Sequence, residues 1–415
     1  MYLGTNYSLD LDFSHSRPLG DQLPNLYTFE DLWKFFDLDA SRLQWLAFHK
    51  ELSTVDHYYR FYIPKRKGGR RRIASPKSEL AKAQRKIKTE ILDQIAVHFS
   101  AMGYRKNFSI VSNAQHHVGK AVVVNADIEN FFQSIKLGKV RKVFRDSGYN
   151  KGVSTVLALL CTDSENYTRV YDGRKYYFAY GGRHLPQGSI TSPALSNLCC
   201  RNLDEKLFAL ADDLFYTYTR YSDDLSFSSE KPMYVGVLLR KINILLQEQG
   251  FSLNTQKTKV QRTNRNQIVT GLSVNEKVNV PRLYYRRFRA FLNYCEKSNL
   301  QDELSNKILG RLNYYKSINL NLVGSLSRRY PWVIDLKGNF EKFNPKVFGL
   351  MWSYSFFYNS DLGVLISQGD KSQVFLVRDN HYINIKSQTK LVFVRDKDIQ
   401  YGAMVKFAKF KEWII

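Results

Sequence analysis

The sequence predicts an α+β fold. Pairs of short strands flank turn residues, as in YYRFYI and IASP around KRKGGRRR and in FYTYTRYSDDLSFSS around Ser-Asp-Asp, which is typical of β-hairpins. Other segments place apolar residues at helical spacing, among them SELAKAQRKIKTEIL and VGVLLRKINILLQEQG. Hairpins interspersed with amphipathic helices favour a mixed architecture.

Composition sets the broad class. The chain has 415 residues, which allows two or three domains, and 44% hydrophobic with 24% charged residues is ordinary for a folded protein. Its four cysteines form neither a CxxC pattern nor a disulfide framework, so we expect them to be reduced. The N-terminus does not resemble a signal peptide, and the longest apolar stretches, such as 153–161, are too short to span a bilayer. We therefore expect a cytoplasmic protein that does not enter a membrane.

The charge balance points to a polyanionic partner. The chain carries 62 Lys and Arg against 38 Asp and Glu, a net charge of +24, together with 27 Tyr and 27 Phe. Cations attract phosphates and aromatic rings can stack on bases, so nucleic acid is the first candidate, although most of these rings are expected to be core.

The first half of the chain predicts these elements in order. Residues 1–50 form an extension with one helix, FEDLWKFFDL. A basic hairpin follows, in a region where residues 60–88 hold twelve Lys or Arg and a single acid, Glu79, and it leads into the helix SELAKAQRKIKTEIL. The buried strand AVVVNADI ends in an acid and continues into the helix IENFFQSI, and a hairpin over 167–180 turns at Asp172-Gly173.

The second half continues the alternation. The loop LPQGSITSP precedes a helix over ALSNLCCRNLDEKLFALA, then the Ser-Asp-Asp hairpin, then a helix closed by Gly250. QIVTGLSV predicts a short strand, and Arg282 to about Val323 is helical and basic. A break is expected at 325–327 and Pro331, followed by the short strands of a small β-rich module in GVLISQGD, QVFLVRDNHYINI and TKLVFVRD.

Three acids stand where strands end. Asp127 closes an apolar strand, and Asp223 and Asp224 sit at a hairpin tip. Adjacent carboxylates repel each other unless a cation binds between them, and hard oxygen ligands suit Mg²⁺. The simpler interpretation of Asp223-Asp224, that aspartates favour turns, holds for the dipeptide alone.

The order of these segments resembles the palm of reverse transcriptases. IPKRKGGRRRI resembles the fingers hairpin, NADIENFFQSI and YSDD the two catalytic segments, GFSLNTQKTKV the next, and VTGLSVNEKVNVPR the primer grip. The resemblance implies a right-hand polymerase with fingers, a palm with an antiparallel sheet and a helical thumb. The expected domains are an N-terminal helical extension (1–50), fingers and palm (51–265), primer grip and thumb (266–323) and a β-rich C-terminal module of unknown role (324–415).

Two smaller motifs indicate a subgroup. NAQHH (113–117) resembles the NAxxH motif of retron reverse transcriptases, and Val269-Thr270-Gly271 resembles their VTG motif. Together they favour retrons and related defence-associated reverse transcriptases. Ser222 occupies a position of the YxDD box where Ala, Met or Val is more familiar, which leaves the subgroup open.

The resemblance implies a role for each matched position. Asp127, Asp223, Asp224 and the carbonyl of Ile128 would bind two Mg²⁺ ions, and Lys257 would protonate the departing pyrophosphate, unless it is a solvated lysine. The positions implied to bind the deoxynucleoside triphosphate are Lys65, Arg71, Phe132, Gln187 and Gly188, with Phe132 as a steric gate against a ribose 2′-hydroxyl. Those implied to contact nucleic acid are Asn113, His117, Val269, Thr270, Gly271, Arg286, Arg287 and Arg289, although His117 can equally be a structural residue.

The function implied is RNA-directed DNA synthesis. The enzyme would copy a dedicated structured non-coding RNA into DNA by two-metal nucleotidyl transfer, in antiphage defence. The sequence leaves open protein-primed or untemplated DNA synthesis, a catalytically idle RNA-binding scaffold, and an effector protein or a second copy of the chain as partner.

Overall fold

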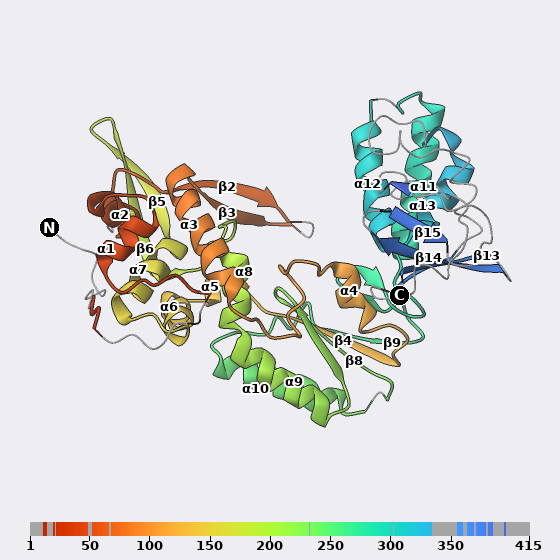
Figure 1. Cartoon of the computed structure of the whole chain (residues 1–415), viewed down its shortest axis with the longest axis horizontal. Helices are drawn as coiled ribbons and strands as arrows, with labels where there is room; N and C mark the ends of the chain where they lie inside the picture. Colours follow the sequence, from red (N-terminus) through yellow and green to blue (C-terminus); the bar gives the residue numbers. More distant parts are fainter. Residues whose placement is uncertain are drawn as a thin grey trace. The chain divides into compact units, whose positions relative to one another are not determined.

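The computed structural model describes residues 11–14, 20, 22–48, 52–65, 68–231, 233–301 and 303–333, and five strands beyond them. The chain divides into two compact units, Met1–Val278 and Asn279–Ile415 (Figure 1). Each unit is described separately below.

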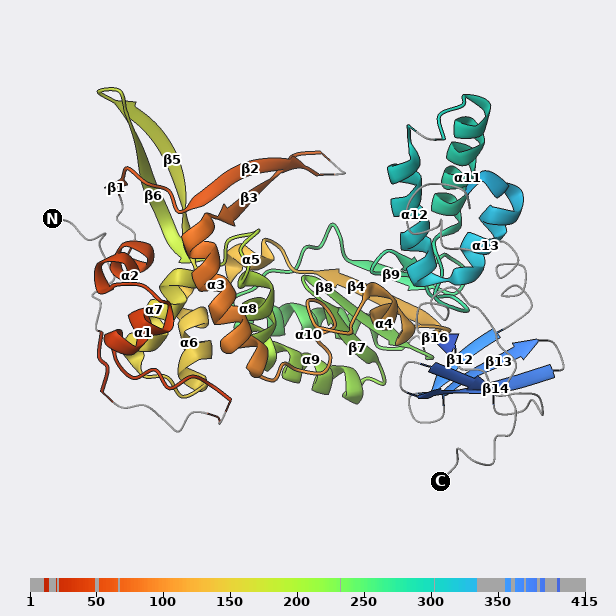
Figure 2. The same ribbon diagram turned by 45° about the horizontal axis from the view of Figure 1, so that its top comes forward.

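A four-stranded antiparallel sheet lies at the centre of the first unit. It contains β4 (Val122–Asp127), β7 (Thr217–Tyr221), β8 (Asp224–Ser229) and β9 (Lys259–Arg262) in the order β7-β8-β4-β9. β4 is an interior strand, hydrogen-bonded on both sides, and its apolar residues are buried, as the sequence predicted. Two helices, α9 (Arg201–Asp213) and α10 (Val235–Glu248), lie beside this sheet, and α9 packs on β7 (Figure 2).

Two antiparallel ribbons extend from the same unit (Figure 2). The first pairs β2 (Tyr58–Pro64) with β3 (Arg70–Pro76), and the second pairs β5 (Asp163–Tyr171) with β6 (Arg174–His184). A short strand, β1 (Leu52–Ser53), adds to β6. Both predicted hairpins are confirmed, and the second is longer than the predicted 167–180.

Helices complete this unit. The buried helix α7 (Lys151–Cys161) contacts α1 (Phe29–Phe35), α2 (Ala40–Ala47), α3 (Ser78–Glu90) and α6 (Leu137–Asp146). The remaining short helices are η1 (Leu92–Gln94), α4 (Ile110–Gln115), α5 (Phe131–Ser134) and α8 (Ser192–Cys199). Side chains of Thr28, Asp39 and Asn150 cap α1, α2 and α7.

Three predicted elements of the first unit differ in detail. The helix expected directly after Asp127 begins only at Phe131, because Asn130 adopts a left-handed conformation with φ 48°. The helix expected after the LPQGSITSP loop is two helices, α8 and α9, which meet at Cys200. The strand expected at QIVTGLSV is a hairpin of β10 (Ile268–Val269) and β11 (Leu272–Ser273).

The described residues of the second unit form three α-helices with their own hydrophobic cluster. They are α11 (Arg282–Lys297), α12 (Ser305–Ile318) and α13 (Leu320–Arg329), followed by η2 (Pro331–Val333). The break predicted at 325–327 is wrong, because α13 runs through it and the hydroxyls of Ser325 and Ser327 donate to the carbonyls of Asn321 and Val323.

Five strands follow in an antiparallel meander. They are β12 (Ser355–Asn359), β13 (Gly363–Gln368), β14 (Lys371–Arg378), β15 (His381–Asn384) and β16 (Val394–Arg395). Most of the predicted strand TKLVFVRD and the first ten residues of the chain lie outside the described residues.

Among the described residues, none of the helices combines the length and apolar character needed to cross a bilayer.

Candidate active site

The sheet brings the three acids to one edge. Asp127 of β4 and Asp224 of β8 are direct partners in the antiparallel register, so their side chains lie on the same face. Asp223 precedes β8 in the turn, and its carbonyl accepts a hydrogen bond from the Ile128 amide at 3.0 Å. Residues that are far apart in the chain therefore form one acidic site.

The turn that carries Asp223 is held by polar contacts. Ser222 adopts a left-handed conformation, φ 61°, which is costly for a residue with a side chain. The hydroxyls of Tyr104 and Ser222 are 2.9 Å apart, and the guanidinium of Arg220 donates to the Ser222 carbonyl at 3.2 Å. A Cβ at Gly103 would lie 3.0 Å from the Ser222 nitrogen, so the glycine allows the two segments to approach closely.

A cavity of about 810 Å³ opens beside these acids. Predicted site residues from β3, β4, α5 and the loops between elements line it: Lys65, Arg71, Asp127, Ile128, Phe132, Gln187, Asp223 and Lys257. Asp224 and Gly188 are not among its lining residues. The chain thus places cations of the β2–β3 ribbon and the acids of the sheet around one space.

Proximity of like charges perturbs the acids. Partial removal from water raises the pKa of Asp224 to about 7, and the carboxylates of Asp223 and Asp127 push it in the same direction. The pKa of Asp127 is also raised, first by burial and then by Asp223, against the opposing effect of Lys257. A bound cation would relieve this repulsion.

Lys257 supplies the nearest positive charge. Its ammonium donates to both carboxylate oxygens of Asp127, at 2.7 and 2.9 Å. Although partial burial alone would lower the pKa of Lys257, the ion pair with Asp127 outweighs it and the pKa is raised. Within the part of the chain that the structure describes, no three Asp, Glu, His or Cys side chains converge tightly enough to form a preformed metal cage.

Known proteins resemble this chain over the same region. Residues 63–282 match the reverse transcriptase (RNA-dependent DNA polymerase) family. The chain is 38% identical over 306 residues to the retron Mx162 reverse transcriptase of Myxococcus xanthus, an alignment that covers 70% of this chain and 63% of that protein. It is 34% identical over 307 residues to the retron Mx65 reverse transcriptase of the same organism, covering 74% and 72%, and 31% identical over 282 residues to the retron Ec86 reverse transcriptase of Escherichia coli, covering 66% and 81%.

The chain belongs to the retron reverse transcriptases. The family resemblance predicted from the motifs is thereby confirmed. The chain spans just under two thirds of the length of the Mx162 relative.

The β2–β3 ribbon of this reverse transcriptase divides its cations between two tasks. Lys65 and Arg71 are exposed and face the cavity. Arg72 also lines the cavity, but it forms an ion pair with Glu165 and donates to Asn166, so it ties the ribbon to β5.

Phe132 and the segment 187–188 were predicted to bind the nucleotide. Phe131 is buried, while its neighbour Phe132 is half-buried and faces the cavity. The main-chain carbonyl of Gln187 accepts from the Ala74 amide at 2.8 Å. Gly188 has φ +109°, and a Cβ there would lie 2.6 Å from the Ile73 side chain, so the close approach that requires glycine is to β3.

The retron motifs are mostly buried, which corrects part of the predicted nucleic-acid surface. Asn113, His117 and Val269 are each 0% exposed and offer no surface to a ligand. The two ring nitrogens of His117 lie 2.7 Å from the hydroxyls of Ser228 and Thr219, and burial lowers its pKa to about 3. His117 is therefore a neutral structural residue.

The VTG segment packs against the NAQHH segment. The Thr270 hydroxyl donates to the Ile110 carbonyl at 3.1 Å and lies 3.5 Å from the Asn113 amide. Thr270 is half-buried and Gly271 is exposed. In the second unit, Arg286 and Arg287 of α11 are exposed and Arg289 is half-buried.

A buried charged network beneath the acidic turn was missed from sequence. Arg220 and Asp204 are both fully buried and form two hydrogen bonds, at 2.8 and 2.6 Å. Tyr218 donates to Asp204 at 2.8 Å, and Arg220 also reaches Asn197 at 3.1 Å. Two features of the sequence could have indicated this network: Arg220 lies on a strand next to the turn, and Asp204 lies among the apolar residues of α9.

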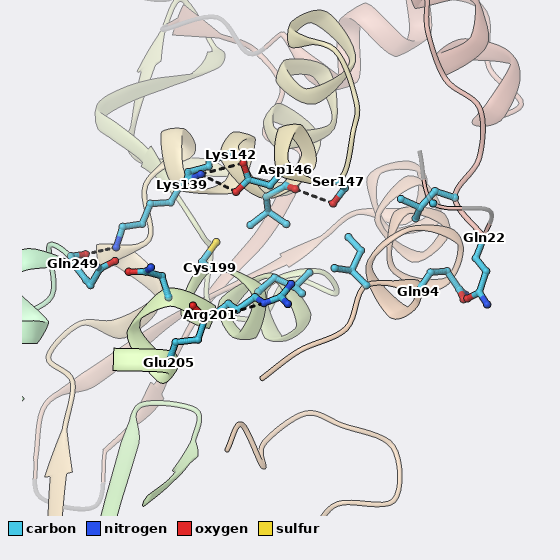
Figure 3. A pocket seen from close by; sticks show the side chains of 16 residues that line it. Gln22, Gln94, Lys139, Lys142, Asp146, Ser147, Cys199, Arg201, Glu205 and Gln249 are labelled. Atoms are coloured by element: carbon cyan, nitrogen blue, oxygen red, sulfur yellow. Dashed lines mark hydrogen bonds and ion pairs between the residues drawn. The ribbon is translucent and has the colours of Figure 1, made fainter. Parts of the chain in front are cut away.

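A second cavity, of about 880 Å³, lies away from the acids, between α6 and the α8–α9 region (Figure 3). Its charged side chains already have partners: Lys142 pairs with Asp146, Arg201 with Glu205, and Lys139 donates to the Gln249 carbonyl. Burial raises the pKa of the Cys199 thiol, which disfavours the reactive thiolate. These residues do not make a second catalytic site.

Proposed function

We propose that this chain copies a dedicated structured non-coding RNA into DNA, using deoxynucleoside triphosphates. The observation that carries the proposal is the direct pairing of Asp127 with Asp224 across β4 and β8, beside a cavity that the fingers cations share. Membership of the retron reverse transcriptases supports the same reaction.

The donor set fits two divalent cations. Asp127, Asp223 and Asp224 supply hard carboxylate oxygens, and the pKa values of Asp127 and Asp224 are raised first by burial and then by repulsion between the carboxylates, which a cation would relieve. The Ile128 amide faces Asp223, and its carbonyl, on the same edge of this extended residue, is a further candidate ligand. When bound, Mg²⁺ ions would lower the pKa of the primer hydroxyl and stabilise charge on the phosphates.

The remaining side chains would bind and orient the nucleotide. Lys65 and Arg71 approach the cavity from the ribbon, where they can neutralise a triphosphate. Phe132 lines the same space and would exclude a ribose 2′-hydroxyl, while Gln187, which also lines it, would support the nucleotide together with its neighbour Gly188. The raised pKa of Lys257 keeps it protonated at neutral pH, the state that a proton donor to pyrophosphate needs.

The surrounding assignments follow from the family. We assign residues 51–265 to fingers and palm, and 266–323 to the primer grip and thumb, where Gly271, Arg286 and Arg287 are exposed for contact with nucleic acid. Thr270 and Arg289 support them from half-buried positions. The net charge of +24 suits an RNA partner in the cytoplasm. A role in antiphage defence is part of the proposal.

The test is to purify the protein from its native locus and sequence the RNA and DNA that copurify. A unique RNA that is joined to DNA or copied into it would support the proposal and identify the priming mode. DNA synthesis without a template would indicate the protein-primed or untemplated alternative.

A variant carrying Asp127→Ala and Asp223→Ala tests catalysis in cells. Loss of both the DNA and the phenotype is the expected result. A phenotype retained without DNA would show an RNA-binding scaffold instead and would overturn the proposal.

A further inference from the structure

The β5–β6 ribbon carries aromatic side chains that no core contact explains. Its cross-strand partners, which share a face, include Tyr167 with Phe178, Arg169 with Tyr176, and Tyr171 with Arg174. We call these six residues the aromatic face. They consist entirely of tyrosine, phenylalanine and arginine.

This face is accessible and is not needed for packing. Tyr167 is 48% exposed, Tyr171 76%, and Tyr180, which continues the same face toward the base, 53%. None of the six belongs to either hydrophobic cluster found among the described residues. Exposed rings of this kind are costly unless a partner uses them.

The rings and cations are already arranged as a stacking surface. Tyr167 and Phe178 stack with centroids 5.2 Å apart and planes 6° apart, and the Arg169 guanidinium lies 5.7 Å from the Tyr167 centroid. Residues two apart on a strand lie about 6.6 Å from each other, so successive rings stand separately along the ribbon. The single acid between Tyr167 and Tyr180 is Asp172, in the turn.

The base of the ribbon is anchored. Arg60 pairs with Asp163 at 2.7 Å, both side chains being largely buried, and Arg72 pairs with Glu165. The distal part therefore extends from a fixed base and need not fold on binding.

We propose that the aromatic face of the β5–β6 ribbon binds single-stranded nucleic acid. Aromatic planes that alternate with cations suit unpaired bases and their phosphates, whereas a duplex keeps its bases stacked inside. An acidic or apolar protein surface would not use the four rings and two guanidinium groups of this face as fully. The inference rests on the proposed function for its ligand class, but not on catalysis.

The test compares two triple variants. Arg169→Thr, Tyr171→Thr and Tyr176→Thr remove one cation and two rings from the aromatic face, and threonine keeps strand propensity. The matched control, Val170→Thr, Lys175→Thr and Tyr177→Thr, removes one cation, one ring and one aliphatic side chain from the opposite face of the same ribbon.

Protein freed of copurifying nucleic acid is titrated into fluorescent single-stranded RNA, single-stranded DNA and duplex RNA, without Mg²⁺, and anisotropy is measured. We expect the aromatic-face variant to bind single strands on the order of ten- to a hundredfold more weakly and duplex RNA unchanged. The larger loss, for RNA or for DNA, identifies which strand the ribbon holds. Equal losses of single-strand affinity in both variants, or no loss in either, would overturn the inference. Loss of binding to a protein partner, with binding to nucleic acid unchanged, would also overturn it.

Two controls separate this inference from the proposed function. Extension of a short annealed primer should stay within about twofold in the aromatic-face variant, while Asp127→Asn should bind single strands like the wild type. If neither the wild type nor the aromatic-face variant extends a primer, but the variant still binds single strands more weakly than the wild type, the proposed function fails and the ribbon inference stands. If the triple variant does not fold, Tyr171→Thr alone, at the most exposed ring, serves as the test.

Discussion

The acidic turn at residues 221–224 and the packed pair of segments 113–117 and 269–271 both resemble family motifs, yet the chain uses them differently. The turn places Asp223 and Asp224 in accessible positions above a buried network. The packed pair buries Asn113, His117 and Val269 completely. A motif can therefore leave acidic side chains accessible in one region and bury its side chains in internal packing in another.

The largest expected effect lies at the acids. Asp127→Asn should remove several kcal/mol of transition-state stabilisation, on the order of a thousandfold in single-turnover nucleotide incorporation. Asp213→Asn, the same change at an exposed acid on α9, is the matched control and should leave the rate unchanged. Equal rates in both variants would show that Asp127 is not part of the reactive site.

The network beneath the turn should affect stability first. Asp204→Ala leaves Arg220 buried without its carboxylate and should cost about 3–5 kcal/mol of unfolding free energy in urea denaturation. Asp204→Leu combined with Arg220→Met should recover much of this stability. Incorporation should stay low in the double variant because the hydrogen bond to the Ser222 carbonyl is lost; full recovery of rate would contradict a positioning role.

The packed segments should show a pH signature. The pKa of His117 is about 3 in the folded chain against an ordinary 6.5, so the unfolded chain binds the extra proton between these values. The stabilisation from a neutral His117 is present above pH 6.5 and is lost as the pH falls, by about 2 kcal/mol between pH 7 and pH 5. His117→Gln should remove this component from unfolding curves recorded at both pH values; an unchanged pH dependence would mean that His117 is not buried as described.

The smallest effect is expected at Thr270. Thr270→Ala removes one hydrogen bond to the Ile110 carbonyl and should cost about 1 kcal/mol of unfolding free energy. Affinity for single-stranded RNA, measured by anisotropy, should not change, since the hydroxyl is used inside the protein. A tenfold loss of affinity with unchanged stability would show that this segment contacts RNA directly.

Local pattern was enough to predict much of this fold. The two ribbons, α3, α10 and the acidic hairpin follow from turn residues and periodicity. That Asp127 would meet Asp223 and Asp224 was implied by the resemblance of the ordered segments to the reverse transcriptase palm. Local pattern did not predict the environment of residues whose burial and hydrogen bonds depend on partners far away in the chain. His117 is fixed by Thr219 and Ser228, more than a hundred positions away.

The same limit applies to the elements that differed. The serines of α13 suggested a break, but their hydroxyls bond within the helix and its apolar side joins a core formed by α11 and α12. Arg220 is charged yet fully buried, because Asp204 forms an ion pair with it. The packing of α13 with α11 and α12 and the ion pair between Arg220 and Asp204 both join distant residues, so neither can be read from neighbouring residues.

The most direct test compares one residue from the acidic turn (221–224) with one from the packed segments (113–117 and 269–271). Nucleotide incorporation rate and unfolding free energy are measured for both Asp224→Asn and His117→Gln. The account predicts that Asp224→Asn loses the rate while stability is unchanged or higher, since a repelled carboxylate is removed. It predicts that His117→Gln loses stability while the rate per folded molecule is retained. The reverse pattern, a destabilised Asp224 variant with normal rate or a stable His117 variant without activity, would contradict it.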